Sequence, residues 1–258
     1  MATALARGCV AAGLTSAEQI HASDPVEGAR ISFAAAVTGA SVGDDNAAVL
    51  AACDTIVLAV KPQMMADVLA DVRTQAASRH LFVSIAAGKT LAWLAEQLPP
   101  ETRLVRVMPN TPCLIGEGAS CFSRGAAATD ADAALVEQLL GSVGLAREVD
   151  ESLLDAVTGL SGSGPAFVYT AIEAMAAGAV AKGMSPELAL ELAAATARGA
   201  AGMIRETGLS PAELRAQVTS PGGTTLAGLQ TLENMAGAAA FQAAVEAAAK
   251  RSIELGES

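Results

Sequence analysis

The sequence predicts an α/β protein in two parts, a doubly wound parallel sheet followed by an all-helical domain. In the first half, short apolar runs rich in β-branched residues alternate with helix-like segments, as in buried parallel strands that helices cover on both faces. From about Glu151 the strand signals stop, and alanine, leucine and glutamate recur at helical spacing. We therefore expect two domains, residues 1–150 and residues 151–258.

Individual elements follow from the same patterns. We predict strands over 20–23, 54–60, 80–85 and 103–108, and helices over 46–52, 62–77 and 90–97. In the second half, Ser185-Pro and Ser210-Pro have the form of helix starts, because serine caps a helix and proline suits its first position. A further helical stretch runs from Thr225 to about residue 255.

Composition indicates an intracellular globular protein. The 258 residues are 52% hydrophobic and 17% charged, which is enough to bury a large core. A net charge of −11 disfavours nucleic acid as a partner, because phosphate binding needs clustered Lys and Arg. The alanine-rich runs are interrupted by charge, so we predict no membrane span and no signal peptide.

Cysteine and histidine spacing points to no metal and no histidine base. The four cysteines, Cys9, Cys53, Cys113 and Cys121, show no C-x-x-C pattern, and we expect buried thiols in a reducing cytoplasm. The two histidines have no carboxylate or cysteine partner at a recognisable spacing.

Two glycine clusters in the second half indicate sites where another group comes close to the backbone. The run Thr219-Ser-Pro-Gly-Gly-Thr-Thr225 puts a turn directly before a helix start, where bare N–H groups attract an anion such as a carboxylate. Leu160-Ser-Gly-Ser-Gly-Pro165 interrupts an alanine-rich helical region, where each glycine costs about 1 kcal/mol relative to alanine. We expect a kink there, and tight helix packing is the competing explanation.

Together with Asp54-Thr-Ile-Val-Leu-Ala-Val-Lys-Pro-Gln63, Ser84-Ile-Ala-Ala-Gly88 and Met108-Pro-Asn-Thr-Pro112, these clusters make the chain resemble the pyrroline-5-carboxylate reductase family from Met1 to about residue 254. The resemblance implies reduction of a cyclic imine to proline, the last step of proline biosynthesis, with NADPH (NADP) or NADH (NAD) as cofactor. It also implies a homodimer, formed by the helical domain, that can assemble into a larger ring. Cofactor preference and ring size stay open.

The amino terminus departs from the family pattern. A Rossmann-like sheet begins with an apolar strand and a G-x-G-x-x-G/A turn, whose glycines let the backbone approach the pyrophosphate. Met1-Ala-Thr-Ala-Leu-Ala-Arg-Gly8 instead resembles the helix that follows this turn. We therefore expect a sheet that lacks its first strand, and weak cofactor binding. We favour a start assigned too late over a natural loss of the strand.

The expected cofactor residues lie at strand ends. Ser23 and Asp24 end the second strand of the family fold, where a hydroxyl tolerates a 2′-phosphate and a carboxylate binds a 2′-hydroxyl. Asp24 is equally well explained by a turn, and Asn46 is better explained as a helix cap than as an adenosine contact. The resemblance also places Ala59, Val60, Lys61, Pro62, Ala86, Ala87, Gly88 and Asn110 beside the cofactor, with a purely structural turn as the alternative for Asn110.

The expected substrate residues are Ser220, Gly222, Gly223, Thr224 and Thr225. Backbone N–H groups of this loop would hold the ring carboxylate at a helix start, and the Thr225 hydroxyl would hydrogen-bond the imine nitrogen. An ordinary Pro-Gly-Gly helix cap is the simpler explanation, but it gives no reason for the flanking hydroxyl groups.

Two other functions compete. A hydroxy-acid reductase with the same two-domain plan would carry a catalytic lysine in its helical domain, whereas Lys182 stands in an Ala-Lys-Gly-Met turn. A catalytically silent scaffold would keep the dimer and lack the phosphate-binding turn.

Overall fold

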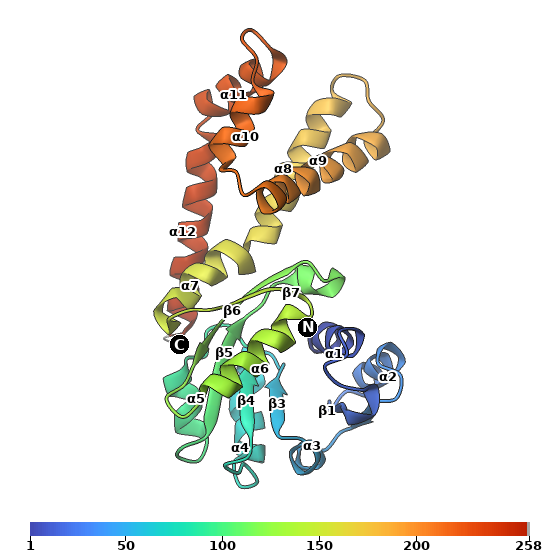
Figure 1. Cartoon of the computed structure of the whole chain (residues 1–258), viewed down its shortest axis with the longest axis vertical. Helices are drawn as coiled ribbons and strands as arrows, with labels where there is room; N and C mark the ends of the chain where they lie inside the picture. Colours follow the sequence, from blue (N-terminus) through green and yellow to red (C-terminus); the bar gives the residue numbers. More distant parts are fainter. Residues whose placement is uncertain (257–258) are drawn as a thin grey trace. The chain divides into compact units, whose positions relative to one another are not determined.

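The computed structural model describes residues 1–256 and divides into two compact units (Figure 1). One unit comprises Met1–Gly162 together with the chain from Ala248 onward, and the other comprises Ser163–Ala247. The predicted boundary after residue 150 lies a short way before this division. The return of the chain's last helical turns to the first unit was not expected from the sequence.

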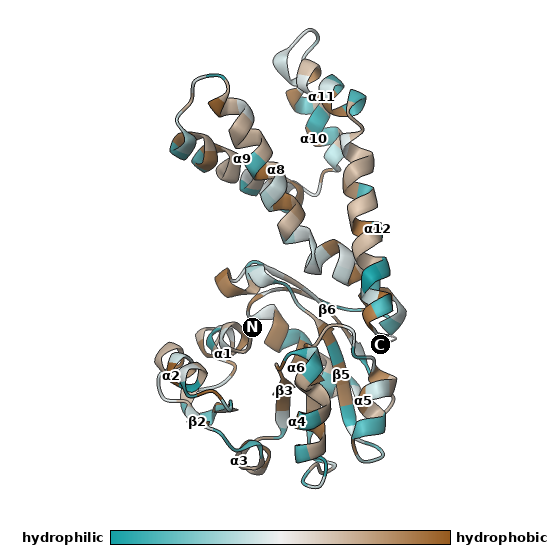
Figure 2. Ribbon diagram, turned by 180° about the vertical axis from the view of Figure 1, so that it is seen from behind, coloured by the Kyte–Doolittle hydropathy of each residue, from teal (hydrophilic) through white to brown (hydrophobic). Residues whose placement is uncertain are grey.

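The core of the first unit is a five-stranded sheet in the order β3-β4-β5-β6-β7, formed by Thr55–Leu58, Leu81–Ser84, Arg103–Met108, Gly118–Arg124 and Gly144–Glu148. Strands β3, β4 and β5 are parallel neighbours. Strand β6 runs antiparallel to β5 and parallel to β7. The predicted parallel sheet is thus confirmed for its first strands, and Figure 2 shows the hydrophobic colouring of β3.

A second, separate sheet consists of β1 (His21–Ser23) and β2 (Ser41–Gly43), which pair in parallel. Among the described residues, no strand joins β1 to β3. Both strands line one cavity of about 1000 Å³, which α1 (Ala2–Ala11) also borders. The open position between β1 and β3 confirms the prediction of a sheet without its first strand.

The free edge of β3 can be located from its hydrogen bonds. Leu81 N–H donates to Asp54 O, and Ile85 N–H donates to Leu58 O, so these alternate residues face β4. The backbone groups of Thr55 and Val57 therefore face away from β4, toward the cavity.

Helices cover both faces of the large sheet. On one face, α1 and α6 (Asp130–Gly141) pack on alternate strand residues, and this core contains Leu5, Val83, Val105, Phe122 and Leu140. On the other face, α3 (Asn46–Ala52), α4 (Met65–Val72) and α5 (Leu91–Gln97) enclose Leu50, Met65, Phe82 and Leu94. Because successive strand residues point to opposite faces, neighbouring residues such as Phe82 and Val83 belong to different cores.

Several elements differ from their predicted form. Strands β2, β6 and β7 and helices α2 (Glu27–Ala36) and α6 were not predicted. The predicted helix 62–77 is a 3₁₀ turn, Pro62–Met64, followed by α4, which ends at Val72.

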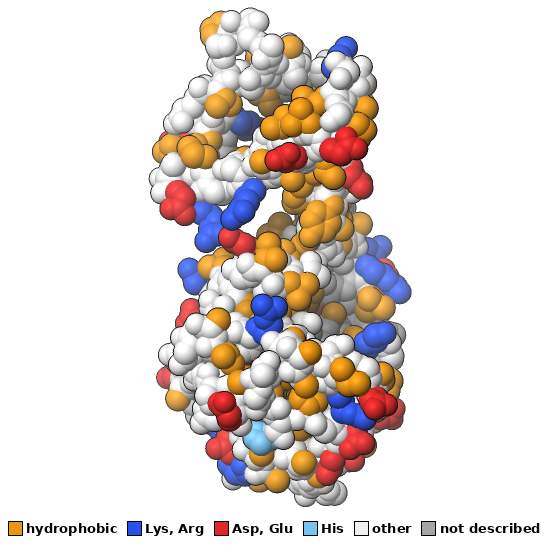
Figure 3. Space-filling model, turned by 90° about the vertical axis from the view of Figure 1, so that its right-hand side faces the viewer, with side chains coloured by type: hydrophobic (Ala, Val, Ile, Leu, Met, Phe, Trp, Pro, Cys, Tyr) orange, Lys and Arg blue, Asp and Glu red, His pale blue; other side chains and the backbone are white. Residues whose placement is uncertain are grey.

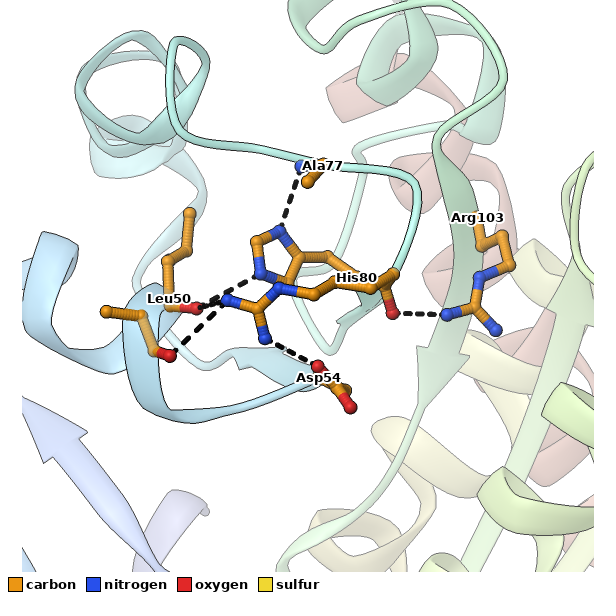
Figure 4. A network of polar contacts seen from close by, with 7 residues as sticks. Leu50, Asp54, Ala77, His80 and Arg103 are labelled. Atoms are coloured by element: carbon orange, nitrogen blue, oxygen red, sulfur yellow. Dashed lines mark hydrogen bonds and ion pairs between the residues drawn. The ribbon is translucent and has the colours of Figure 1, made fainter.

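A buried polar network joins α3 to the start of β4 (Figure 4). The ring of His80, which is 1% exposed, accepts a hydrogen bond from Ala77 N–H at Nδ1 and contacts Leu50 O through Nε2, both at 3.0 Å. Since Nδ1 is an acceptor, Nε2 carries the proton, and this N–H donates a hydrogen bond to Leu50 O. Arg79 donates to the same carbonyl and to Asp54, each at 2.6 Å. His80 therefore has a structural role.

The second unit is helical, as predicted, and contains α8 (Gly164–Val180), α9 (Pro186–Thr207), α10 (Pro211–Val218) and α11 (Thr224–Asn234). Helix α12 (Gly237–Gly256) begins in this unit and ends in the first. The predicted caps are confirmed, since Ser185 and Ser210 accept N–H bonds from Leu188 and Glu213. No helix within residues 1–256 is long and apolar enough to cross a membrane.

One buried cation anchors the last helical turns of the first unit. The guanidinium of Arg106, on β5, lies 3.0 Å from Glu151 and 3.9 Å from Asp155, and its side chain is 6% exposed. Glu151 also accepts the N–H of Leu91 at 2.7 Å. Asp155 accepts the hydroxyl of Ser252, near the end of α12, at 2.6 Å. The sheet, α5 and the end of α12 therefore share one charged cluster.

We expect Arg106→Ala to lower the free energy of unfolding by about 2 to 4 kcal/mol, because it leaves two partly buried carboxylates without a cation. Arg124→Ala serves as a control, since Arg124 pairs with Asp130 and Glu148 nearer the surface, where solvent screens an ion pair and makes its contribution to stability small. Urea denaturation followed by circular dichroism measures both. Equal losses in the two variants would contradict this account of the cluster.

Candidate functional site

The candidate cofactor site lies where the parallel strands β3, β4 and β5 end. Parallel neighbours bring their carboxyl ends to one edge of a sheet, and open α/β sheets bind ligands at that edge. The three segments that follow these strands are residues 59–62, 85–88 and 109–112. Each of the three carries residues that the sequence assigned to the cofactor.

After β3, Ala59 and Val60 line the cavity that also borders β1. Lys61 is exposed and precedes the 3₁₀ turn that Pro62 begins. It forms no ion pair with any residue between 1 and 256. Its ammonium group is therefore available to a phosphate.

After β4, Ala86 is buried, and Gly88 adopts a left-handed conformation with φ of 76°. Glycine is the residue that takes this conformation without steric strain. A Cβ at Gly88 would also lie 3.3 Å from the carbonyl oxygen of Leu255, near the end of α12. The turn 86–88 is therefore fixed by its own backbone and by the last turn of α12.

After β5, Asn110 is 8% exposed and points into the protein. Its Nδ2 donates to the carbonyl of Ser161 at 3.0 Å, and its Oδ1 accepts the N–H of Ala119 at 2.9 Å. The sequence left open a cofactor contact and a structural turn as the role of Asn110. This geometry favours the structural role, although the bonds reach beyond a local turn.

At the end of β1, the Ser23 hydroxyl donates to Asn46 Oδ1 at 2.5 Å, and Asn46 Nδ2 donates to Asp71 at 2.9 Å. The cap of α3 is Asp45, whose carboxylate accepts the N–H of Ala47, so the interpretation of Asn46 as the cap is wrong. Asn46 is the first helical residue, and its side chain reaches Ser23. The structure thus brings these two predicted cofactor residues together.

The carboxylate of Asp24 forms a local turn. Its Oδ1 accepts the N–H of Val26 at 2.8 Å, and its carbonyl accepts a hydrogen bond from Arg30, also at 2.8 Å. This is the turn that the sequence offered as the alternative explanation for Asp24. The contact of the Arg30 guanidinium with the carbonyls of Asp24 and Pro25 was not predicted, because a hydrogen bond to a backbone carbonyl leaves no sequence signal.

In the helical unit, the predicted substrate residues form a turn that leads into α11. Gly222 has φ of 71°, Gly223 is the N-cap residue, and Thr224 begins the helix. Gly223 N–H donates to Ser220 O at 3.0 Å, so this N–H is not one of the free donors that the sequence predicted.

The free donors of this turn belong to its other residues. Within the described part of the chain, the N–H groups of Gly222, Thr224 and Thr225 have no hydrogen-bond acceptor, and the first N–H groups of a helix have none inside the helix. The Thr225 side chain is half-buried. The turn therefore offers an anion several N–H donors and the positive end of an eleven-residue helix.

The cysteines offer no nucleophile. Burial raises the pKa of the Cys9, Cys53 and Cys121 thiols, which keeps them protonated at neutral pH. All four cysteines are free, and the described residues contain no cluster of His, Cys, Asp and Glu that could hold a metal ion.

Comparison with known families matches two parts of the chain. Residues 151–255 match the model described as pyrroline-5-carboxylate reductase dimerisation. Residues 1–88 match the model described as NADP oxidoreductase coenzyme F420-dependent.

Relatives match over nearly the whole chain. The pyrroline-5-carboxylate reductase of Methanosarcina acetivorans is 46% identical over 257 residues, which cover 100% of this chain and 95% of that protein. Pyrroline-5-carboxylate reductase 3 of Rattus norvegicus is 44% identical, with 99% of this chain and 92% of that protein covered.

Solved structures show the same fold. A pyrroline-5-carboxylate reductase from Coxiella burnetii superimposes with a TM-score of 0.93 at 31% identity, covering 100% of this chain and 96% of that one. The pyrroline carboxylate reductase of Plasmodium falciparum with NADP bound gives a TM-score of 0.87 at 32% identity, covering 98% and 93% of the two chains.

The Rossmann-like sheet and the helical domain define an oxidoreductase that uses a nicotinamide dinucleotide. Within that class, the chain belongs to the pyrroline-5-carboxylate reductase family.

We expect a chain extended ahead of Met1 by an apolar strand and a Gly-x-Gly-x-x-Ala turn to bind NADPH much more tightly than the 258-residue chain. The added strand fits the open position between β1 and β3, and the glycine turn brings N–H groups to the pyrophosphate at the start of α1. Titration calorimetry measures both chains. A matched extension with valine in place of the glycines controls for the strand alone, and equal affinities in all three chains would refute the expectation.

Proposed function

We propose that the protein reduces 1-pyrroline-5-carboxylate to L-proline with NADPH or NADH, as the last step of proline biosynthesis in the cytoplasm. The main support is the match to pyrroline-5-carboxylate reductases over nearly the full length of the chain. The two predicted sites add physical support, because one suits a dinucleotide and the other a carboxylate.

The dinucleotide is held along the carboxyl edge of the sheet. Ser23 and Asn46, already joined by a hydrogen bond, suit the hydroxyl and phosphate groups of the adenosine half. The exposed ammonium group of Lys61 suits a phosphate, and the small residues 86–88 let the backbone after β4 pass beside the flat nicotinamide ring. When bound, the cofactor supplies the hydride, and the protein supplies binding and orientation.

The substrate carboxylate binds at the turn before α11. The free N–H groups of Gly222 and Thr224 and the positive end of the helix stabilise a carboxylate without a charged side chain. This matters in a chain of net charge −11, which repels an anion at long range. The half-buried hydroxyl of Thr225 is the group that we assign to the imine nitrogen.

Dimerisation through the helical unit is the second part of the proposal, and assembly into a larger ring is an extension of it. The fully buried apolar residues of this unit are the alanines Ala176, Ala189 and Ala193, and the partly buried Ile172 and Met184 pack against them. Large apolar side chains are instead exposed on its helices, as Figure 3 illustrates, and they include Val168, Tyr169, Met175, Leu190, Ile204, Leu232 and Phe241. A surface of this kind is typical of an obligate interface between copies of one chain.

Reduction of a hydroxy acid's keto form by the same two-domain plan is less well supported. That reaction would need a lysine in the helical unit as a proton donor. Lys182 is exposed in the turn after α8, where its N–H donates to Ala179 O at 2.9 Å, and is not part of a helix face.

We expect Thr225→Ala, in the chain extended by the strand and glycine turn, to lower kcat by about 10- to 1,000-fold, the effect of one positioned donor on a transition state. Thr224→Ala should do less, because it keeps the backbone N–H that holds the carboxylate. Steady-state kinetics with 1-pyrroline-5-carboxylate and NADPH measure both variants. If Thr225→Ala loses only about 1 kcal/mol of stability and keeps its turnover, the turn is a helix cap and not a substrate site.

We expect the full chain to sediment as a dimer or a larger assembly at micromolar concentration. The exposed apolar side chains of the helical unit require an interface of the obligate size, above roughly 2,000 Å². Analytical ultracentrifugation measures this directly. A well-folded monomer at micromolar concentration would contradict the proposed dimer.

A further inference from the structure

The side chain of Asn110 bridges two backbone groups that are distant in sequence. Its Nδ2 donates to Ser161 O at 3.0 Å across 51 residues, and its Oδ1 accepts Ala119 N–H at 2.9 Å across nine residues. Ala119 lies in β6, and Ser161 lies in the helical turn Thr158–Gly162. With 8% of its surface exposed, Asn110 fills a position where unpaired polar groups are costly.

The two partners require an amide. Ser161 O needs a donor and Ala119 N–H needs an acceptor, and both must be reached from one short side chain. A carboxamide has both groups, whereas an ionised carboxylate has acceptors alone and would face the Ser161 carbonyl with a negative charge. The same two partners fix which end of the amide is oxygen.

The turn that Asn110 holds is a π-helix, where the sequence predicted a kink. Thr158–Gly162 forms this wider turn, a conformation that is frequent at functional sites. The Ser161 hydroxyl donates to Val157 O inside the turn, at 3.1 Å, and the Ser161 carbonyl accepts from Asn110. The side of the turn also touches β5, because a Cβ at Gly162 would lie 2.5 Å from the Met108 side chain.

We propose that Asn110 is a positioning residue whose carboxamide holds the π-helical turn 158–162 in place at the carboxyl end of β5. Met108 ends β5, and Asn110 follows it at the sheet edge where a dinucleotide binds in open α/β folds. The turn contributes no side chain to the reaction in this proposal. It lines one side of the cofactor site, and Asn110 holds it in position. The consequence for catalysis rests on the proposed reductase function, whereas the hold on the turn does not.

Hydrogen exchange of the full chain tests the hold on the turn. Asn110→Ala should speed exchange of the backbone N–H groups of residues 158–162 by about 5- to 30-fold, and leave those of β3 and β4 unchanged. Thr111→Ala is the matched control, since Thr111 is the exposed neighbour of Asn110 and should leave the turn as it is. Unchanged exchange in Asn110→Ala would overturn the proposal, as would a uniform increase throughout the first unit.

The pH dependence of hydrogen exchange in Asn110→Asp distinguishes a hydrogen-bonding role of Asn110 from a purely steric one. When ionised, the new carboxylate repels Ser161 O, so the turn should exchange faster than in the parent at about pH 8. Burial raises the pKa of such a carboxyl, and once protonated it donates to Ser161 O as the amide does. The difference from the parent should therefore shrink as the pH falls to about 5. A difference that is independent of pH would contradict the donor role.

Kinetics test the consequence for catalysis. Asn110→Ala should lower kcat by about 10- to 100-fold with a smaller change in KM. A displaced turn 158–162 disturbs the geometry of the reacting atoms more than it disturbs binding of the substrate in its ground state. Faster exchange of the turn with an unchanged kcat would overturn the positioning role. If the parent itself does not reduce 1-pyrroline-5-carboxylate, the proposed function fails, and the exchange measurements still decide whether Asn110 holds the turn.

Discussion

The parallel register of β3, β4 and β5 is the constraint on which the first unit depends. It brings three strand ends to one edge of the sheet, and the segments that follow those strands carry Lys61, Gly88 and Asn110. It also separates the two cores, because alternate residues of each strand face opposite helix layers. The charged cluster around Arg106 on β5 then attaches α5 and the end of α12 to the same sheet.

Elements with strong local patterns were predictable from the sequence. The bounds of β5 and α3 agree with the prediction residue for residue, since the first is a β-branched apolar run and the second is an apolar helix after an Asp-Asp cap. Strand β2 is only Ser-Val-Gly, and β6 consists largely of small and polar residues, so neither has a periodic apolar pattern. These strands form because neighbouring strands offer them hydrogen bonds, which is long-range information.

The candidate site shows the same division. The sequence motifs located the segments of the candidate site, but they did not indicate the hydrogen-bond partners of Asn110 and Asn46. Asn110 binds backbone groups 51 and nine residues away, and a backbone partner leaves no trace in residue identity. Asn46 was mistaken for a cap because Asp45, one residue earlier, fills that role and turns Asn46 toward Ser23. For the turn 220–225, the sequence predicted backbone N–H groups without an acceptor. The N–H groups of Gly222 and Thr224 have this property, but that of Gly223 donates to Ser220 O.

Transfer of the cofactor's hydride to the imine is the central step of the proposed reaction. It can be followed with NADPH that carries deuterium in place of both hydrogens at C4 of the nicotinamide. This cofactor is mixed with the protein and 1-pyrroline-5-carboxylate, and the product is analysed by mass spectrometry. We predict proline heavier by one deuterium, located on the former imine carbon. Proline without deuterium, or no proline from a chain that binds the cofactor, would contradict the proposed reaction.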